Sequence, residues 1–149
     1  LSDGEGGVMN LPQMTFRPNT PMAPPRHLLA MVGTGMNAGK TTSCVQLIKS
    51  LSSRGLRVGA CKLTGSVSNR DQDEMKAAGA AKVVDFSDYG FPSTYLCSKD
   101  VILSLFHTMM ADLEMHRPDI IVMEIADGVL QRETRFLLED ALLRQQIGG

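Results

Sequence analysis

The chain has 149 residues, of which 43% are hydrophobic and 21% are charged, and its formal net charge is −1. This length and composition predict one globular domain, and the near-neutral charge excludes the basic footprint of a protein that binds nucleic acid or an anionic membrane surface. No apolar run approaches the roughly 18 residues that a membrane-crossing helix needs, and the N-terminus shows no signal-peptide pattern.

The first 26 residues are expected to lie outside the folded domain. They hold five of the seven prolines, and their apolar residues show no period. This composition is typical of a linker or a disordered arm. We therefore predict a domain over residues 27–149. Because it ends just after a helical pattern, we expect it to be incomplete and to belong to a longer protein with further domains.

A glycine-rich connection follows the first predicted strand, at 28–33, and precedes the first predicted helix, at 39–53. Because this connection ends in Gly39-Lys40-Thr41, it predicts a loop whose main-chain N–H groups bind phosphate. Lys40 would contact the β- and γ-phosphates, and the Thr41 hydroxyl would bind Mg²⁺. The plainer interpretation is a glycine-rich turn with an exposed lysine. The predicted phosphate loop comprises Thr34, Gly35, Met36, Asn37, Ala38, Gly39, Lys40, Thr41 and Thr42.

The rest of the chain alternates between strand and helix patterns. Strands that alternate with helices predict an α/β fold, in which a mostly parallel sheet carries helices on both faces as a three-layer sandwich. Ligands bind at the carboxyl ends of the strands in such sheets. The further predicted strands are 57–63, 82–86 and 119–125, the helices are 70–79, about 101–113 with Ser98 as its cap, and 130–146, and the loops are 64–69 and 87–94.

Polar residues near the carboxyl ends of the predicted strands are further candidates for a site. Glu124 lies near the end of an apolar strand and Asp127 follows it, so both could hold Mg²⁺. Lys62 ends the second strand and could neutralise a phosphate or a substrate carboxylate, and Asp71 could be another Mg²⁺ ligand. Each residue also has a plainer interpretation. Glu124 could be a strand-end carboxylate at a helix N-terminus, and Asp127 could belong to an Asp-Gly turn. Lys62 could be a solvated lysine, and Asp71 could be a charge at the start of a helix.

Two further groups of residues are predicted to have structural roles. The cysteines are odd in number and widely spaced, which indicates buried reduced thiols in a cytoplasmic protein; they are Cys44, Cys61 and Cys97. A set of surface ion pairs is predicted after the last strand, from Arg132, Glu133 and Arg135.

The phosphate loop resembles that of the P-loop proteins related to dethiobiotin synthetase. The usual spacing would place glycine at Thr34, whereas this family carries Gly-Thr, four residues and Gly-Lys-Thr, as Gly33-Thr34 and 39–41 do here. The family's second strand ends in a lysine that contacts substrate and phosphate, and Lys62 matches it. A later strand of the family ends in an acidic Mg²⁺ ligand before small residues, which is similar to 124–128.

Two other groups share parts of this pattern. The segment from Asp71 to Ala80 resembles the GTP-binding adaptor of molybdopterin-guanine dinucleotide synthesis, in which an aspartate precedes an Ala-Gly-Ala run. Over about residues 28–143, the chain is similar to an uncharacterised bacterial group whose P-loop domain follows another N-terminal domain. The shared signatures are 36–42, 62–65, 85–88 and 124–134. A broader relative of that group is an N-acetyltransferase for an acidic D-amino acid, which implies that the loop could hold a coenzyme A phosphate.

We therefore predict Mg²⁺-dependent binding of ATP or GTP with transfer or hydrolysis of the γ-phosphoryl group, and the resemblance adds activation of a substrate carboxylate. Two alternatives stay open: a nucleotide-binding adaptor without catalysis, and a coenzyme A-dependent N-acyltransferase. The expected partners are the nucleotide, a small-molecule substrate and, as a homodimer, a second copy of the chain. The predicted catalytic residues are Lys40, Lys62 and Glu124, and the predicted metal ligands are Thr41, Asp71, Glu124 and Asp127.

Overall fold

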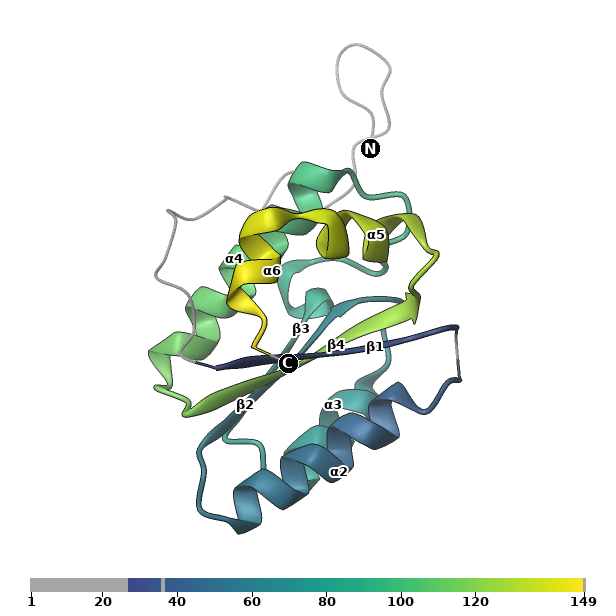
Figure 1. Ribbon diagram of the computed structural model, residues 1–149. Coiled ribbons are helices and arrows are strands. Elements are labelled where there is room, and N and C mark those ends of the chain that lie inside the picture. Colours follow the sequence, from purple (N-terminus) through teal and green to yellow (C-terminus); the bar gives the residue numbers. More distant parts are fainter. Residues whose placement is uncertain (1–26, 36, 149) are drawn as a thin grey trace.

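The computed structural model describes residues 27–35 and 37–148. The predicted arm over 1–26, together with Met36 and Gly149, lies outside the described residues. Within them, parallel strands form one sheet in the order β1-β4-β2-β3 (Figure 1). The strands are β1 (Leu28–Gly33), β2 (Val58–Thr64), β3 (Lys82–Asp85) and β4 (Ile120–Gly128).

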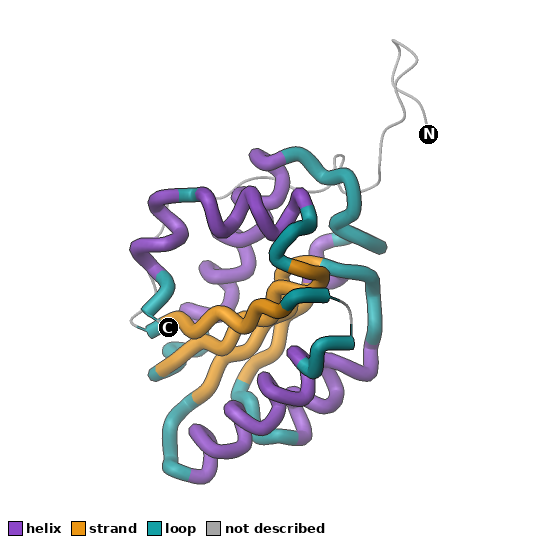
Figure 2. The backbone as a smooth tube through the Cα atoms, turned by 45° about the vertical axis from the view of Figure 1, so that its right-hand side comes forward, coloured by secondary structure: helices purple, strands orange, loops and turns teal. Residues whose placement is uncertain are grey.

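Helices cover both faces of the sheet (Figures 1 and 2). On one face lie α2 (Lys40–Ser53) and α3 (Asn69–Ala77); on the other lie α4 (Lys99–Met115), α5 (Arg132–Glu139) and α6 (Ala141–Gln146). A separate apolar cluster fills each interface between sheet and helices. The predicted three-layer α/β fold with a parallel sheet is thus confirmed. No helix in the described part of the chain combines the length and the apolar character that a bilayer crossing needs.

The alternation of side chains along β2 decides which face Lys62 occupies. Val58 and Ala60 belong to the apolar cluster under α2 and α3, whereas Cys61 and Leu63 belong to the cluster under α4. Successive strand residues point to opposite faces of a sheet. Lys62 therefore lies on the α2 and α3 face, at the carboxyl end of its strand.

The long predicted helix at about 101–113 is α4, and its apolar stripe packs against the sheet as expected. The hydroxyl oxygen of Ser98 accepts a hydrogen bond from the Val101 N–H at 3.4 Å, so Ser98 is the N-cap that the sequence predicts. Apart from the half-buried Val101, the predicted apolar residues are buried: Ile102, Leu105, Phe106, Met109, Met110 and Leu113.

The prediction of one helix over 130–146 is wrong, because the chain breaks at Asp140 into α5 and α6. Asp140 has an extended backbone, with φ −73° and ψ 120°. Its Oδ1 accepts a hydrogen bond from the Leu143 N–H at 3.0 Å, and its C=O accepts one from Arg144. An aspartate that bonds nearby main chain in this way starts a new helix instead of continuing the old one.

Two predicted boundaries also shift. The third strand stops at Asp85, and a short 3₁₀ helix (Phe86–Tyr89) replaces the start of the loop predicted at 87–94. The last strand continues beyond the predicted end at 125, because Gly128 pairs with Gly33 of β1 after an irregularity in the register. Both changes lie at the carboxyl edge of the sheet.

The cysteine thiols are free, as predicted; Cys44 and Cys61 are buried, but Cys97 is partly exposed. Burial raises the pKa of the Cys44 thiol to about 12 and also raises that of Cys61. The thiolate is the reactive form, so burial makes Cys44 and Cys61 poor nucleophiles. We expect iodoacetamide to alkylate Cys97 first in the native protein, as followed by mass spectrometry. Equal labelling rates for the three thiols before urea is added would contradict this burial.

Candidate functional site

The phosphate loop joins the end of β1 to the start of α2, at the carboxyl edge of the sheet. Met36 lies outside the described residues, and the rest of the loop is described. Gly39, the residue before α2, has a φ of 79°, a left-handed conformation that favours glycine. Among the described residues, no side chain caps this end of α2. The N–H groups of the first turn therefore lack a side-chain acceptor, which is the arrangement that binds a phosphate.

Lys40 lies within the turn of the phosphate loop and is only 7% exposed. Its ammonium Nζ donates a hydrogen bond to the Gly35 carbonyl oxygen at 2.7 Å. A Cβ on Gly33 would lie 3.1 Å from the methylene carbons of Lys40, so the lysine stem packs against the end of β1. The exposed lysine of the plainer interpretation is thus wrong, because the loop folds around this side chain.

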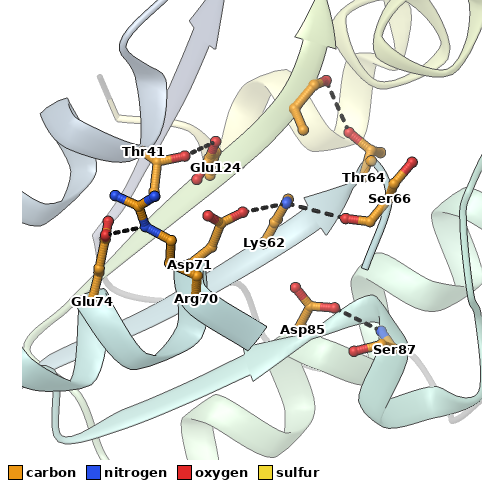
Figure 3. Close-up of polar contacts among 12 residues, drawn as sticks. Thr41, Lys62, Thr64, Ser66, Arg70, Asp71, Glu74, Asp85, Ser87 and Glu124 are labelled. Atoms are coloured by element: carbon orange, nitrogen blue, oxygen red, sulfur yellow. Dashed lines mark hydrogen bonds and ion pairs between the residues drawn. The ribbon is translucent and has the colours of Figure 1, made fainter. Parts of the chain in front are cut away.

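Glu124 and Thr41 meet across the site, although 83 positions separate them in the chain (Figure 3). The Thr41 hydroxyl donates to Oε1 of Glu124 at 2.9 Å. Glu124 is 2% exposed, and its Oε2 has no hydrogen-bond partner within the described residues. Burial raises the pKa of Glu124, and the Thr41 hydrogen bond opposes this change. A buried carboxylate oxygen without a donor is unfavourable, so the site is suited to a cation.

Lys62 and Asp71 form an ion pair on the other side of Glu124 (Figure 3). The Lys62 ammonium donates to Oδ2 of Asp71 at 2.5 Å and to the Ser66 carbonyl oxygen at 3.3 Å. The side chain of Lys62 is 8% exposed, so this lysine is not the solvated strand end of the plainer interpretation. Asp71 belongs to the first turn of α3, and its predicted contact with a metal stays a prediction.

A cavity of about 550 Å³ extends from the phosphate loop to the start of α3. Its polar lining includes the two cations and two carboxylates described above. The sequence did not indicate the lining residues that the β2–α3 connection and α3 contribute. Single small residues in a predicted loop give no signal of a site, and Arg70 and Glu74 belong to a predicted helix whose packing beside the site is not encoded locally. These missed lining residues are Gly65, Ser66, Ser68, Arg70 and Glu74, together with Ala126 of β4.

The main chain after Glu124 continues the strand. Asp127 is part of β4 and not of a separate Asp-Gly turn, whereas its side chain lies outside the described residues. Its predicted contact with Mg²⁺ therefore stays a prediction. The Ala126 carbonyl oxygen accepts hydrogen bonds from the hydroxyls of Thr64 at 3.1 Å and Thr134 at 3.4 Å. These bonds join the end of β4 to β2 and to α5.

The predicted surface ion pairs are only partly correct. Arg135 pairs with the exposed Glu139, at 2.6 Å. Glu133, in contrast, is 3% exposed, and its Oε1 accepts from the Leu96 N–H at 2.8 Å and from Arg132 Nη2 at 3.0 Å. Glu133 thus anchors the loop before α4, a contact that local sequence does not predict because the partner is 37 positions away.

The phosphate loop rests directly on the end of β4 at Gly128. A Cβ built on Gly128 would lie 2.5 Å from the Thr34 carbonyl oxygen, and the Val129 N–H donates to the Gly33 carbonyl at 2.9 Å.

We therefore expect Gly128→Ala to displace the loop and to lower the free energy of unfolding by about 1–3 kcal/mol, as overpacking does. Urea unfolding measures this loss. Gly35→Ala is the matched control, because no atom of the described residues is recorded within 4 Å of its Cβ. Equal losses for the two variants would contradict the contact.

Comparisons with known proteins identify the fold. No protein-family model matches the sequence, and no curated protein matches it significantly. Among solved structures, the chain is similar to the signal recognition particle 54 kDa protein from Aeropyrum pernix in complex with GDP, with a TM-score of 0.54 and 20% identity over 91% of this chain and 28% of that one. It is also similar to the signal recognition particle receptor FtsY from Elizabethkingia anophelis in complex with GDP. The TM-score is 0.53, and the identity is 18% over 87% of this chain and 37% of that one.

A third similar structure is the cell division protein FtsY from Thermotoga maritima, with a TM-score of 0.52 and 17% identity over 89% of this chain and 43% of that one. The chain therefore spans less than half the length of each of these proteins. At this level of identity, the likeness shows the fold. The chain has the α/β fold of P-loop NTPases, whereas the specific relation to dethiobiotin synthetase stays a prediction.

Proposed function

We propose that this protein binds a nucleoside triphosphate and Mg²⁺ in the cavity beside the phosphate loop, and transfers or hydrolyses the γ-phosphoryl group. The contact between Thr41 and Glu124, at 2.9 Å, carries this proposal. It joins a hydroxyl at the start of α2 to a buried carboxylate, next to main-chain N–H groups that no side chain caps within the described residues. Two of the similar structures are complexes with GDP, which supports a nucleotide as the ligand.

The residues at this contact fit Mg²⁺. Glu124 has a buried oxygen without a hydrogen-bond partner in the described part of the chain, and Thr41 supplies a second hard oxygen. The described residues contain no group of three or more His, Cys, Asp or Glu that could hold a metal. Mg²⁺ does not require one, because it is usually held by one or two carboxylates together with waters and substrate phosphates. When bound, Mg²⁺ would neutralise charge on the phosphates.

The other residues of the site have separate roles in this proposal. The N–H groups of the phosphate loop bind phosphate oxygens, and Lys40 stabilises the charge that develops on the transferred group. Lys40 is already held in the turn by its bond to Gly35. Asp71 and Asp127 are the further metal ligands in this proposal.

The lining of the cavity beyond the phosphate loop supports phosphoryl transfer to an acceptor. This lining includes Ser66, Ser68 and Arg70, and the Lys62 ammonium donates to the Ser66 carbonyl oxygen at 3.3 Å. Lys62 pairs with Asp71 at 2.5 Å, and the exposed Arg70 guanidinium pairs with Glu74 at 2.7 Å. An anionic acceptor, such as a carboxylate that becomes activated by phosphorylation, would compete with these carboxylates for the two cations.

Calorimetric titration of the full chain with ATP, GTP and acetyl-coenzyme A, each with Mg²⁺, tests the proposal. We expect ATP or GTP to bind, and EDTA to weaken that binding. Binding of acetyl-coenzyme A alone would instead favour the acyltransferase alternative. A phosphate-release assay with and without small carboxylic acids then separates the enzyme from the adaptor, because an adaptor would hydrolyse slowly and without regard to the acid.

A further inference from the structure

A second buried carboxylate, that of Asp85, lies near the site but has no role in the proposed function. Asp85 ends β3 and is 1% exposed. Its Oδ1 accepts from the Ser87 N–H at 2.8 Å, which caps the short 3₁₀ helix. Its Oδ2 has no hydrogen-bond partner within the described residues. The cap uses one oxygen only, so it does not explain why a second, buried oxygen without a donor is present.

Asp85 and Lys62 are neighbours across the sheet. They are register partners between β3 and β2, and Lys62 is also the register partner of Glu124 on β4. Register partners on neighbouring strands point to the same face, and such strands lie about 4.8 Å apart. Lys62 thus stands in a row between two buried carboxylates (Figure 3). Its charge lowers the pKa of Asp85, although burial has the larger effect and raises it.

The present partner of Lys62 comes from outside this row. The Lys62 ammonium donates to Oδ2 of Asp71, on α3, at 2.5 Å. In the proposed function, Asp71 is also a ligand of Mg²⁺. If Asp71 bound Mg²⁺, the cation would compete with the Lys62 ammonium for this carboxylate. A buried ammonium that lost this partner would need another acceptor.

We propose that Asp85 is a positioning residue that receives the Lys62 ammonium on its free Oδ2 when Asp71 turns to the cation. This inference rests on the proposed function for the step that moves Asp71. Lys62 thus stays charged and within the site while its ammonium moves from the Asp71 carboxylate to that of Asp85. Asp85 touches neither nucleotide nor metal; it acts through Lys62.

Urea unfolding of a double-mutant cycle tests this role without any ligand. The cycle compares a reference protein, Asp85→Asn, Asp71→Ala and the double variant. The amide oxygen of Asn can still cap Ser87, so Asp85→Asn alone removes an unpartnered charge and is expected to raise the urea midpoint. All four proteins also carry Glu124→Gln, because Glu124 is the other buried register partner of Lys62 with an unpartnered oxygen among the described residues. With Asp71→Ala, the ammonium then keeps the Ser66 carbonyl and Asp85, so Asp85→Asn is expected to lower the midpoint. An equal shift of the same sign in both backgrounds would overturn the proposal.

Nucleotide titration provides the second readout. Asp85→Asn is expected to weaken binding about tenfold in the presence of Mg²⁺ and to leave binding in EDTA unchanged, because only Mg²⁺ moves Asp71. Asp88→Asn is the matched control: it removes a charge from the same 3₁₀ helix and keeps an acceptor for the Asp85 N–H. Equal weakening with and without Mg²⁺ would overturn the proposal. If wild type binds no nucleotide, the proposed function fails, and the unfolding cycle still decides whether Asp85 can receive Lys62.

Discussion

Lys40→Ala is expected to reduce the affinity for ATP or GTP by about 100-fold or more while the protein stays folded. Lys40 supplies the only ammonium that the structure places inside the turn of the described phosphate loop. A hydrogen bond to a charged group contributes about 1.5–3 kcal/mol, and each 1.4 kcal/mol is a factor of ten in affinity. The loss of more than one such bond to phosphate therefore removes most of the binding. Calorimetric titration measures this loss.

The matched control for this prediction is Lys49→Ala. Lys49 lies on the same helix, α2, and is exposed on its surface. It carries the same charge as Lys40, so a general electrostatic effect would weaken binding in both variants. Circular dichroism and urea unfolding report whether each variant is folded. Unchanged nucleotide affinity in a folded Lys40→Ala protein would rule out the proposed function.

Glu124→Gln is expected to remove most of the dependence of nucleotide binding on Mg²⁺. The amide can still accept the hydrogen bond from Thr41, but it loses the negative charge that the cation needs. Changes to residues that support a metal reduce metal affinity or activity by about 10- to 100-fold, and loss of a ligand is expected to do at least as much. Titrations with Mg²⁺ and with EDTA measure the effect, with Glu139→Gln as the exposed control.

The same substitution is expected to stabilise the ligand-free protein at neutral pH. Burial raises the pKa of Glu124, so the folded state favours the protonated carboxyl. The contribution of this group to stability is therefore present at low pH and is lost as pH rises through its raised pKa. Gln mimics the protonated form at every pH. The gain in the urea midpoint should shrink as pH falls toward about 4, where unperturbed carboxyl groups titrate. A loss of stability at pH 7 would contradict the assigned burial.

The amino-acid sequence predicts the alternation of strands and helices and the position of the phosphate loop, because both depend on local patterns. Lys40, Lys62 and Glu124 are predicted as site residues for a similar reason: each follows or ends a predicted element on the carboxyl edge. Pairings between elements are different. The bond from Lys62 to Asp71 and the burial of Glu133 against Leu96 depend on how α3 and the loop before α4 pack, and no periodicity encodes that packing.

Two misjudged segments have a related physical cause. The helical pattern over 130–146 continues through Asp140, yet its carboxylate bonds the Leu143 N–H and starts a second helix. Asp85 fits a strand pattern, yet it ends β3 by capping the turn that follows. In both cases a short side chain competes with the main chain for a hydrogen bond, and the sequence alone does not decide which one wins.

The place of β4 in the sheet has a consequence for biosynthesis. Among the described strands, β4 is the last to leave the ribosome, yet it lies between β1 and β2 and pairs with both. A nascent chain that ends before Ile120 has neither the carboxylate at 124 nor the glycine at 128, against which the phosphate loop rests. Such distant pairings form slowly during folding. The growing polypeptide therefore completes the contact between the phosphate loop and Gly128 only when this strand inserts, so truncated chains are not expected to bind the proposed nucleotide.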